Sequence, residues 1–167
     1  MGTFTVRDYR AEDAAAVLEI NAANVPEVGE MDASKLAGFA ASAAWLPVVE
    51  VDGKVAAFAV FLTEGADYGS PNYRWFSERH AGFFYVDRIA VGATCRGVGI
   101  GQALYREALV RARAGERPVL CAEVNTVPAN EASLRFHDRL GFKEVARKRP
   151  YDPESEVAML ERPVEAE

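Results

Sequence analysis

Three alternating glycines are the residues whose types and spacing point most directly to chemistry. They lie in the segment Arg96-Gly97-Val98-Gly99-Ile100-Gly101, which follows an apolar run and precedes residues that are apolar at helical spacing. A strand that enters a helix through such a segment exposes unpaired backbone N–H groups at the positive end of the helix dipole, where phosphate binds. Glycine suits these positions because a Cβ would hold phosphate oxygens away from the backbone. The segment therefore predicts a site for a ligand that carries a pyrophosphate.

Two familiar phosphate-binding motifs do not fit these glycines. A P-loop requires Lys-Ser or Lys-Thr after its last glycine, whereas Gln102 follows Gly101. A dinucleotide-binding fingerprint requires G-x-G-x-x-G after the first strand and an acidic residue about 20 residues later. The spacing here is G-x-G-x-G, deep in the chain, although Glu123 does follow at a suitable distance. A nucleotide-dependent oxidoreductase is therefore only a remote alternative.

The elements that must position this segment follow from hydrophobic periodicity and turn signals. An Asp52-Gly53 pair between two apolar runs predicts a hairpin. The expected strands are 3–8, 46–51, 55–62, 83–91, 119–124, 142–145 and 156–160, and the expected helices are 14–20, 33–43, 99–114 and 131–140. This order, β-α-α-β-β-β-α-β-α-β-β, predicts an α/β (α+β) fold with a mixed, mostly antiparallel sheet of about seven strands flanked by about four helices.

Residues 64–80 show no clear period, and we interpret them as a long loop that carries several aromatic side chains, Tyr73 and Trp75 among them. Structureless loops of this length are usually functional or mobile. Two interpretations stay open at this point. The aromatic residues either line a binding site or pack the loop onto the core.

The composition predicts one domain over residues 1–167 and excludes several classes of protein. A formal net charge of −6 argues against nucleic acid as a partner. No apolar run is long enough to span a membrane, and the N-terminus lacks a secretory signal, so we expect a cytoplasmic protein with no membrane partner. The two cysteines, Cys95 and Cys121, and the two histidines show no metal-ligand spacing, so no metal is expected.

The glycine segment resembles the first signature of the GNAT N-acetyltransferase superfamily. That signature is Arg or Gln-x-x-Gly-x-Gly or Ala between a central strand and a helix, and Arg96, Gly99 and Gly101 match it. The predicted order of strands and helices also resembles the order in that family. The resemblance thus extends over essentially the whole chain and implies a GNAT-like fold.

A second segment, residues 130–142, resembles the second signature of the same family, Asn…Ser or Ala…Phe-Tyr…Gly-Phe. Here His137 follows Phe136, where the family usually has a tyrosine that protonates the departing thiolate. This Phe-His pair, with the sequence around strand 83–91, resembles a bacterial branch of the family. The resemblance implies that acetyl-CoA is the co-substrate, with no metal ion.

The resemblance also implies which residues hold the coenzyme. Backbone groups of the central strand would pair with pantetheine, the glycine segment would hold the pyrophosphate, and the second signature would contact the cofactor near the pantetheine arm. In that order these residues are Ile89, Ala90 and Val91; Arg96, Gly97, Val98, Gly99, Ile100, Gly101 and Gln102; and Asn130 and Ser133.

Several residues are candidates for the chemistry on the acceptor side. His137 is a candidate general acid, since an ordinary histidine keeps a protonated fraction near neutrality. Tyr85 and Asp87 share a face of strand 83–91, and Glu123 ends a neighbouring predicted strand, so each is a candidate base. The candidate acceptor-binding residues are Tyr73, Trp75 and Asn125.

The function that the resemblance implies is direct transfer of an acetyl group from acetyl-CoA to a primary amine in a ternary complex. The acceptor would be a small molecule or a peptide. A non-catalytic acyl-CoA-binding sensor on the same fold is the alternative. The sequence leaves open which amine is acetylated, whether the acyl group is longer than acetyl, and whether the chain forms a homodimer.

Overall fold

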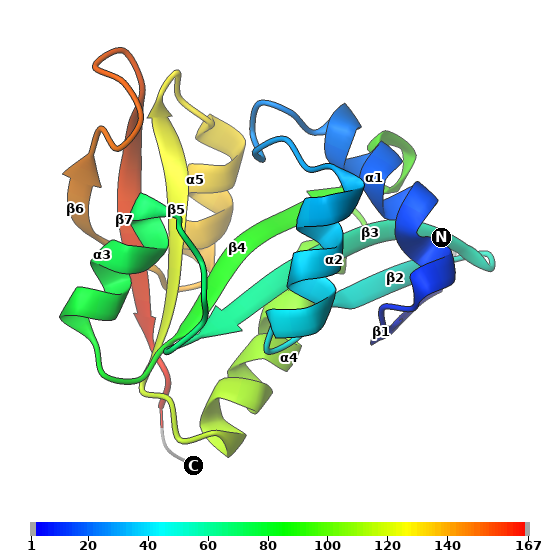
Figure 1. Cartoon of the computed structure of the whole chain (residues 1–167), viewed down its shortest axis with the longest axis horizontal. Helices are drawn as coiled ribbons and strands as arrows, with labels where there is room; N and C mark the ends of the chain where they lie inside the picture. The colour runs from blue at the N-terminus through cyan, green and yellow to red at the C-terminus, as the bar shows by residue number, and fades with distance from the viewer. Residues whose placement is uncertain (1–2, 166–167) are drawn as a thin grey trace. The chain divides into compact units, whose positions relative to one another are not determined.

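A computed structural model describes residues 3–165, which form seven strands and five α-helices (Figure 1). The strands are β1 (Phe4–Asp8), β2 (Pro47–Val51), β3 (Lys54–Thr63), β4 (Phe84–Val91), β5 (Val119–Val127), β6 (Lys143–Lys148) and β7 (Glu156–Pro163). The helices are α1 (Ala14–Ala23), α2 (Ala33–Ser42), α3 (Pro71–Arg79), α4 (Ile100–Ala114) and α5 (Glu131–Arg139). Short 3₁₀ turns, η1 (Ala11–Asp13) and η2 (Ala93–Cys95), precede α1 and follow β4.

The strands form one sheet in the hydrogen-bonded order β1-β2-β3-β4-β5-β7-β6. The β4–β5 pair is parallel, and the β1–β2, β2–β3, β5–β7 and β6–β7 pairs are antiparallel. The predicted mixed, mostly antiparallel sheet is therefore confirmed. The chain divides into two compact units, Met1–Leu62 with Arg88–Glu107 and Thr63–Asp87 with Ala108–Glu167, so that β4 begins in the second unit and ends in the first.

The first unit contains the predicted hairpin. Asp52 and Gly53 connect β2 to β3 with φ angles of 51° and 74°, the two positive values that a tight hairpin turn of this kind requires. All residues of β3 from Ala56 to Leu62 are buried. A strand that is buried on both faces is expected to have a continuous run of apolar residues, and the sequence of β3 has such a run.

In the second unit, β5 lies beside β4 with Phe84 opposite Leu120 and Tyr85 opposite Cys121. A parallel pair needs a crossover connection, and α4 lies within the connection from β4 to β5. β7 pairs with β5 along its whole length, and β6 forms the exposed edge beyond it.

Helix α3 corrects the sequence prediction that residues 64–80 form a structureless loop. The Ser70 hydroxyl accepts a hydrogen bond from the Tyr73 N–H, and Pro71 occupies the first helical turn, where its missing N–H costs nothing. Tyr73 and Phe76 are buried at helical spacing. The Ser-Pro signal for a helix start was present in the sequence. The helix is only nine residues long, however, so its hydrophobic periodicity extends over too few residues to be recognised.

No helix within residues 3–165 combines the length and the apolar character that crossing a bilayer requires.

Candidate active site

The glycine segment forms the turn that leads into α4. Gly97 and Gly99 have φ angles of 78° and 91°, in the region that strains any residue with a Cβ. A Cβ built on either glycine would meet no atom within 4 Å, so the space in front of this backbone is open. The conformation of the chain therefore requires glycine at these two positions.

The start of α4 supplies the donors for an anion. The Ala103 N–H bonds to the Gly99 carbonyl over 3.0 Å, so the N–H groups of Ile100, Gly101 and Gln102 precede the first hydrogen bond of the helix. Such first-turn groups have no partner within their own helix. With the open space at the two glycines, this terminus fits a pyrophosphate.

Gly92 fixes the end of β4, from which the segment departs. Its N–H donates to the Ala56 carbonyl of β3 over 2.8 Å, and a Cβ at this glycine would lie only 3.2 Å from the same oxygen. A larger residue would push β4 away from β3. The close approach therefore sets the direction in which η2 and the glycine segment leave the sheet.

Asn24, the residue that follows α1, connects this region to that helix. Its side-chain amide donates to the Ile20 carbonyl over 2.8 Å and to the Val91 carbonyl over 3.3 Å. Arg96 donates in turn to Asn24 Oδ1 over 3.0 Å and to the Val91 carbonyl over 3.4 Å. The guanidinium of Arg96 is thus held beside the end of β4 by protein groups.

Arg88 is a second positioning residue that sequence reasoning missed. It is buried in β4 and donates hydrogen bonds to Asn21 Oδ1 over 2.9 Å and to the Gly29 carbonyl over 2.8 Å. Its guanidinium also lies 5.4 Å from the ring centroid of Phe39 in α2. One buried cation therefore joins β4 to α1, to the α1–α2 connection and to α2.

In the second unit, two of the predicted polar residues meet directly. The Tyr85 hydroxyl donates to Glu123 Oε1 over 2.8 Å. Burial raises the pKa of Tyr85 well above its ordinary value, and the negative charges of Glu123 and Asp87 raise it further. Tyr85 therefore stays protonated at neutral pH and donates to Glu123, and its role as a candidate base stays a prediction.

Asp87 pairs with a residue of the segment before α3. The Tyr68 hydroxyl donates to Asp87 Oδ1 over 2.5 Å, and the ring of Tyr68 meets the ring of Tyr73 edge to face. The Tyr73 hydroxyl donates to the Thr63 carbonyl over 2.6 Å and accepts from the Ala66 N–H over 2.9 Å. Tyr73 is 3% exposed, and its buried side chain therefore stabilises the conformation of this segment. Within the segment, Tyr68 is the aromatic residue whose hydroxyl bonds to a carboxylate.

Trp75 and Asn125 lie in different surroundings. Trp75 is half-buried in α3, with the guanidinium of Arg79 5.5 Å and the ammonium of Lys148 5.6 Å from its ring centroid. Asn125 lies at an irregular point of the β5–β7 pair, and its carbonyl accepts from the Asn130 N–H over 2.9 Å. Their roles in acceptor binding stay predictions.

The second signature forms the start of α5. Asn130 caps the helix, with its Oδ1 accepting from the Ser133 N–H over 3.2 Å. One turn on, His137 Nδ1 lies 2.8 Å from the Ser133 carbonyl and 3.3 Å from the Ser133 hydroxyl. The His137 ring also meets Phe136 and Phe142 edge to face.

The hydrogen bond to the Ser133 carbonyl determines what His137 can do. A carbonyl only accepts, so Nδ1 carries the proton and Nε2 of the neutral ring presents a lone pair. Burial lowers the pKa of His137, so the protonated fraction at pH 7 is smaller than that of an ordinary histidine. To donate a proton from Nε2, the ring would first have to become protonated, and therefore charged, in an apolar site. The role of His137 as general acid stays a prediction that depends on this protonation.

Residues 14–142 match the acetyltransferase (GNAT) family. This match takes in most of the chain, and the chain therefore belongs to that family. No curated protein sequence gives a significant match.

Solved structures of the same family resemble this chain along its length. An N-acetyltransferase from Staphylococcus aureus Mu50 has 25% identity and a TM-score of 0.73 over 98% of this chain and 99% of that one. The yncA protein of Salmonella typhimurium, solved with its cofactor acetyl-CoA, has 22% identity and a TM-score of 0.71 over 98% and 95%. Arabidopsis thaliana Naa50, solved with the bisubstrate analogue CoA-Ac-MVNAL, has 14% identity and a TM-score of 0.68 over 95% and 97%.

Proposed function

We propose that residues 1–167 act as one acetyl-CoA-dependent N-acetyltransferase domain that transfers the acetyl group directly to a primary amine in a ternary complex. Family membership supports acetyl transfer in general, and the family match runs through segments of both compact units. The observation that carries the proposal for this chain is the turn at Gly97 and Gly99. Its two positive φ angles, open space and helix start fit the pyrophosphate of a coenzyme A.

The coenzyme would be held by the residues that the family resemblance implies. The N–H groups from Gly97 to Gln102 would donate to the pyrophosphate, with Arg96 adding positive charge beside it. Ile89, Ala90 and Val91 would offer backbone groups to pantetheine. The Val91 carbonyl already accepts from Asn24 and Arg96, so the contacts to pantetheine would fall mainly on the two residues before it.

Glu123 is the residue that we propose as the proton acceptor. An amine with an ordinary pKa near 10.4, as in lysine, must lose a proton before it can attack a thioester. A carboxylate held in one orientation by the Tyr85 hydroxyl can accept that proton directly or through a water molecule. Asp87, which the Tyr68 hydroxyl holds in a similar way, is the second candidate.

His137 is proposed to act at the thiol end of the reaction. Acetyl-CoA would supply a thioester from which the thiolate of coenzyme A departs, and a thiolate is stabilised by a donor or a positive charge. The ring is positioned for this by Ser133 and by two flanking aromatic rings. Asn130 and Ser133 would contact the coenzyme from the first turn of α5.

The proposed acceptor is a cationic amine, on a small molecule or a peptide, since acceptors of both kinds occur in the family. The resemblance to Naa50, which was solved with CoA-Ac-MVNAL, makes a peptide amine worth testing beside small amines. The carboxylates of Asp87 and Glu123 would attract an ammonium group. Trp75 and Asn125 are proposed to contact the rest of the acceptor.

Three measurements on the chain of residues 1–167 test the proposal. Isothermal titration with acetyl-CoA should give one binding site per chain. Release of the free CoA thiol, followed over a panel of small amines and peptides, should rise above the rate without acceptor for at least one class. Binding without thiol release for any amine would favour the acyl-CoA sensor. Thermal stabilisation by NAD(P) but not by acetyl-CoA would refute the proposal in favour of the oxidoreductase.

A further inference from the structure

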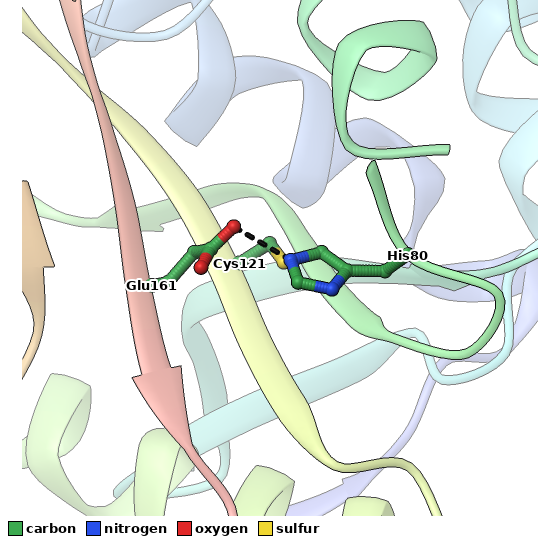
Figure 2. Close-up of side chains that lie close together, drawn as sticks. All are labelled: His80, Cys121 and Glu161. Atoms are coloured by element: carbon green, nitrogen blue, oxygen red, sulfur yellow. Dashed lines mark hydrogen bonds and ion pairs between the residues drawn. The ribbon is translucent and has the colours of Figure 1, made fainter. Parts of the chain in front are cut away.

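Three side chains of the second unit that take no part in the proposed chemistry come together beside α3. His80 follows the last residue of α3, Cys121 lies in β5, and Glu161 lies in β7, as Figure 2 shows. One nitrogen, one sulfur and one oxygen atom from these residues lie within 4.8 Å of one another. The shortest contact joins His80 Nε2 to Glu161 Oε1 over 2.6 Å.

Strand pairing and the end of α3 explain why these residues meet. Cys121 is opposite Glu161 in the antiparallel β5–β7 pair, so both side chains project from the same face of the sheet. His80 caps α3 with its N–H bonded to the Phe76 carbonyl over 2.9 Å. The three residues are about forty positions apart in the chain, so no local spacing of the kind used to find zinc motifs reveals them.

We propose that His80, Cys121 and Glu161 bind one Zn²⁺ ion, with water as the fourth ligand. Imidazole, thiolate and carboxylate are the three ligand types that zinc takes in proteins. Magnesium and calcium prefer sites made of oxygen alone, so a thiol and an imidazole select against them. A thiolate and a carboxylate together also neutralise the charge of the ion.

The site needs a small adjustment to accept the ion. Zinc–ligand bonds of about 2.0–2.3 Å in a tetrahedron place neighbouring ligand atoms roughly 3.3–3.8 Å apart, the nitrogen–oxygen pair at the short end. The 2.6 Å contact between His80 and Glu161 must therefore lengthen by about 0.7 Å on that geometry. Both side chains are able to move, because they lie at the rim with 23% and 12% exposure, whereas Cys121 is fully buried.

Binding the ion redistributes protons without any other reactant. Burial raises the pKa of the Cys121 thiol, so the thiol is protonated until zinc replaces its proton, which passes to solvent. His80 Nε2 donates to the Glu161 carboxylate in the ion-free structure, so its proton must also pass to solvent before this nitrogen binds zinc, and the ring proton is then carried on Nδ1. Arg79 donates to Glu161 Oε1 over 2.6 Å, and it can keep that oxygen as an outer partner of the site while Oε2 binds the ion.

The ion would join the end of α3 to both β5 and β7. It would therefore stabilise the folded chain by mass action, because the unfolded chain holds the three ligands far apart. Glu123 lies two residues beyond Cys121 on the same face of β5, so zinc would stand close to the proposed proton acceptor.

The test uses the chain of residues 1–167 after treatment with EDTA and dialysis, with Co²⁺ as the spectroscopic probe. We expect one equivalent of Co²⁺ to produce a thiolate-to-cobalt charge-transfer absorption that Zn²⁺ then removes. The chain has only two cysteines, which provides a matched control. Cys95→Ser should retain the absorption, and Cys121→Ser should lose it.

A second variant keeps the proposal testable if the buried substitution prevents folding. Glu161→Gln preserves the size of the side chain and an oxygen for Arg79, and it should weaken Zn²⁺ binding at least about 100-fold, since even outer partners contribute 10–100-fold. Added Zn²⁺ should raise the Tm of the unmodified chain and of Cys95→Ser, but not of Glu161→Gln. The absence of cobalt absorption, its dependence on Cys95, or unchanged affinity in Glu161→Gln would overturn the proposal and leave His80 and Glu161 as a structural pair only.

Discussion

The Tyr85 hydroxyl hydrogen-bonds to Glu123 Oε1 over 2.8 Å, and this contact joins the two parallel strands of the sheet. Tyr85 is opposite Cys121 in the β4–β5 pair, so Glu123 is reached diagonally, two residues further along β5. The long tyrosine side chain spans that diagonal. A fully buried donor that is protonated at neutral pH therefore holds a carboxylate in one orientation.

Glu123→Gln should lower kcat by about 10²–10⁴-fold, the usual contribution of a positioned proton acceptor. The affinity for acetyl-CoA should change little, because the proposed coenzyme contacts lie elsewhere. Steady-state kinetics with the best amine, combined with titration of acetyl-CoA, separates the two effects. Tyr85→Phe is the matched control and should lower kcat less than Glu123→Gln does, since it leaves the carboxylate in place. A kcat unchanged by Glu123→Gln would transfer the role to Asp87.

Gly99→Ala should weaken acetyl-CoA binding by at least tenfold. The alanine Cβ meets no protein atom, so the effect would come from backbone strain at a φ of 91° and from occupation of the open space. Gly53→Ala, in the β2–β3 turn, has a φ of 74° and equally open surroundings, which makes it a matched control. We expect both variants to lose a similar amount of stability and only Gly99→Ala to lose affinity. Equal affinities in titration calorimetry would contradict the assignment of the glycine segment.

The pKa of His137 makes stability depend on pH. Its folded pKa lies below the ordinary value of 6.5 because the ring is buried, so the unfolded chain binds more protons between the two values. The free energy of unfolding should therefore be highest above about pH 6.5 and fall as the pH drops through the folded pKa. Urea unfolding at pH 7.5 and pH 5.5 measures this loss, which His137→Phe should reduce.

The same variant tests the proposed role of His137 in the reaction. His137→Phe should lower kcat more than it weakens acetyl-CoA binding. An unaltered rate would remove His137 from the mechanism while leaving the stability result unaffected.

Asp13 provides a test of stability alone. It accepts two hydrogen bonds of 2.9 Å from Arg7 and one of 2.7 Å from the Arg10 N–H, and it is 5% exposed. The hydrogen bonds from Arg7 hold the pKa of this carboxyl below its ordinary value of 3.8. Asp13→Asn should therefore cost about 1.5–3 kcal/mol at pH 7, the range for hydrogen bonds to charged groups.

The sign of the pH effect at Asp13 is opposite to that of a group with a raised pKa. The stabilisation is complete above about pH 3.8 and is lost as the pH falls through the lower folded pKa. The difference in the free energy of unfolding between the unmodified chain and Asp13→Asn should therefore become smaller at acidic pH. Asp52→Asn removes the same charge from an exposed turn where asparagine suits the positive φ, and it should change stability little at either pH. Equal losses in the two variants would show that net charge, and not the Arg7 pair, is responsible.

Local patterns were sufficient to predict most of the secondary structure. The Asp52-Gly53 turn and the apolar run of β3 each reflect a pattern among near neighbours in the chain, and each occurs as predicted. Helix α3 was missed because its aromatic residues pair with distant groups. Tyr73, for example, contacts the rings of Phe83 and Tyr85, which the spacing within residues 64–80 does not reveal.

The sequence by itself determined the glycine turn and, except for α3, the type and order of the elements, because these depend on backbone conformation and on periodicity within short segments. Only the tertiary structure decided what the polar residues do. The partner that Glu123 receives and the meeting of His80 with Cys121 and Glu161 both depend on strand register. Register joins residues about forty positions apart, and a single sequence carries no local signal for such a pairing.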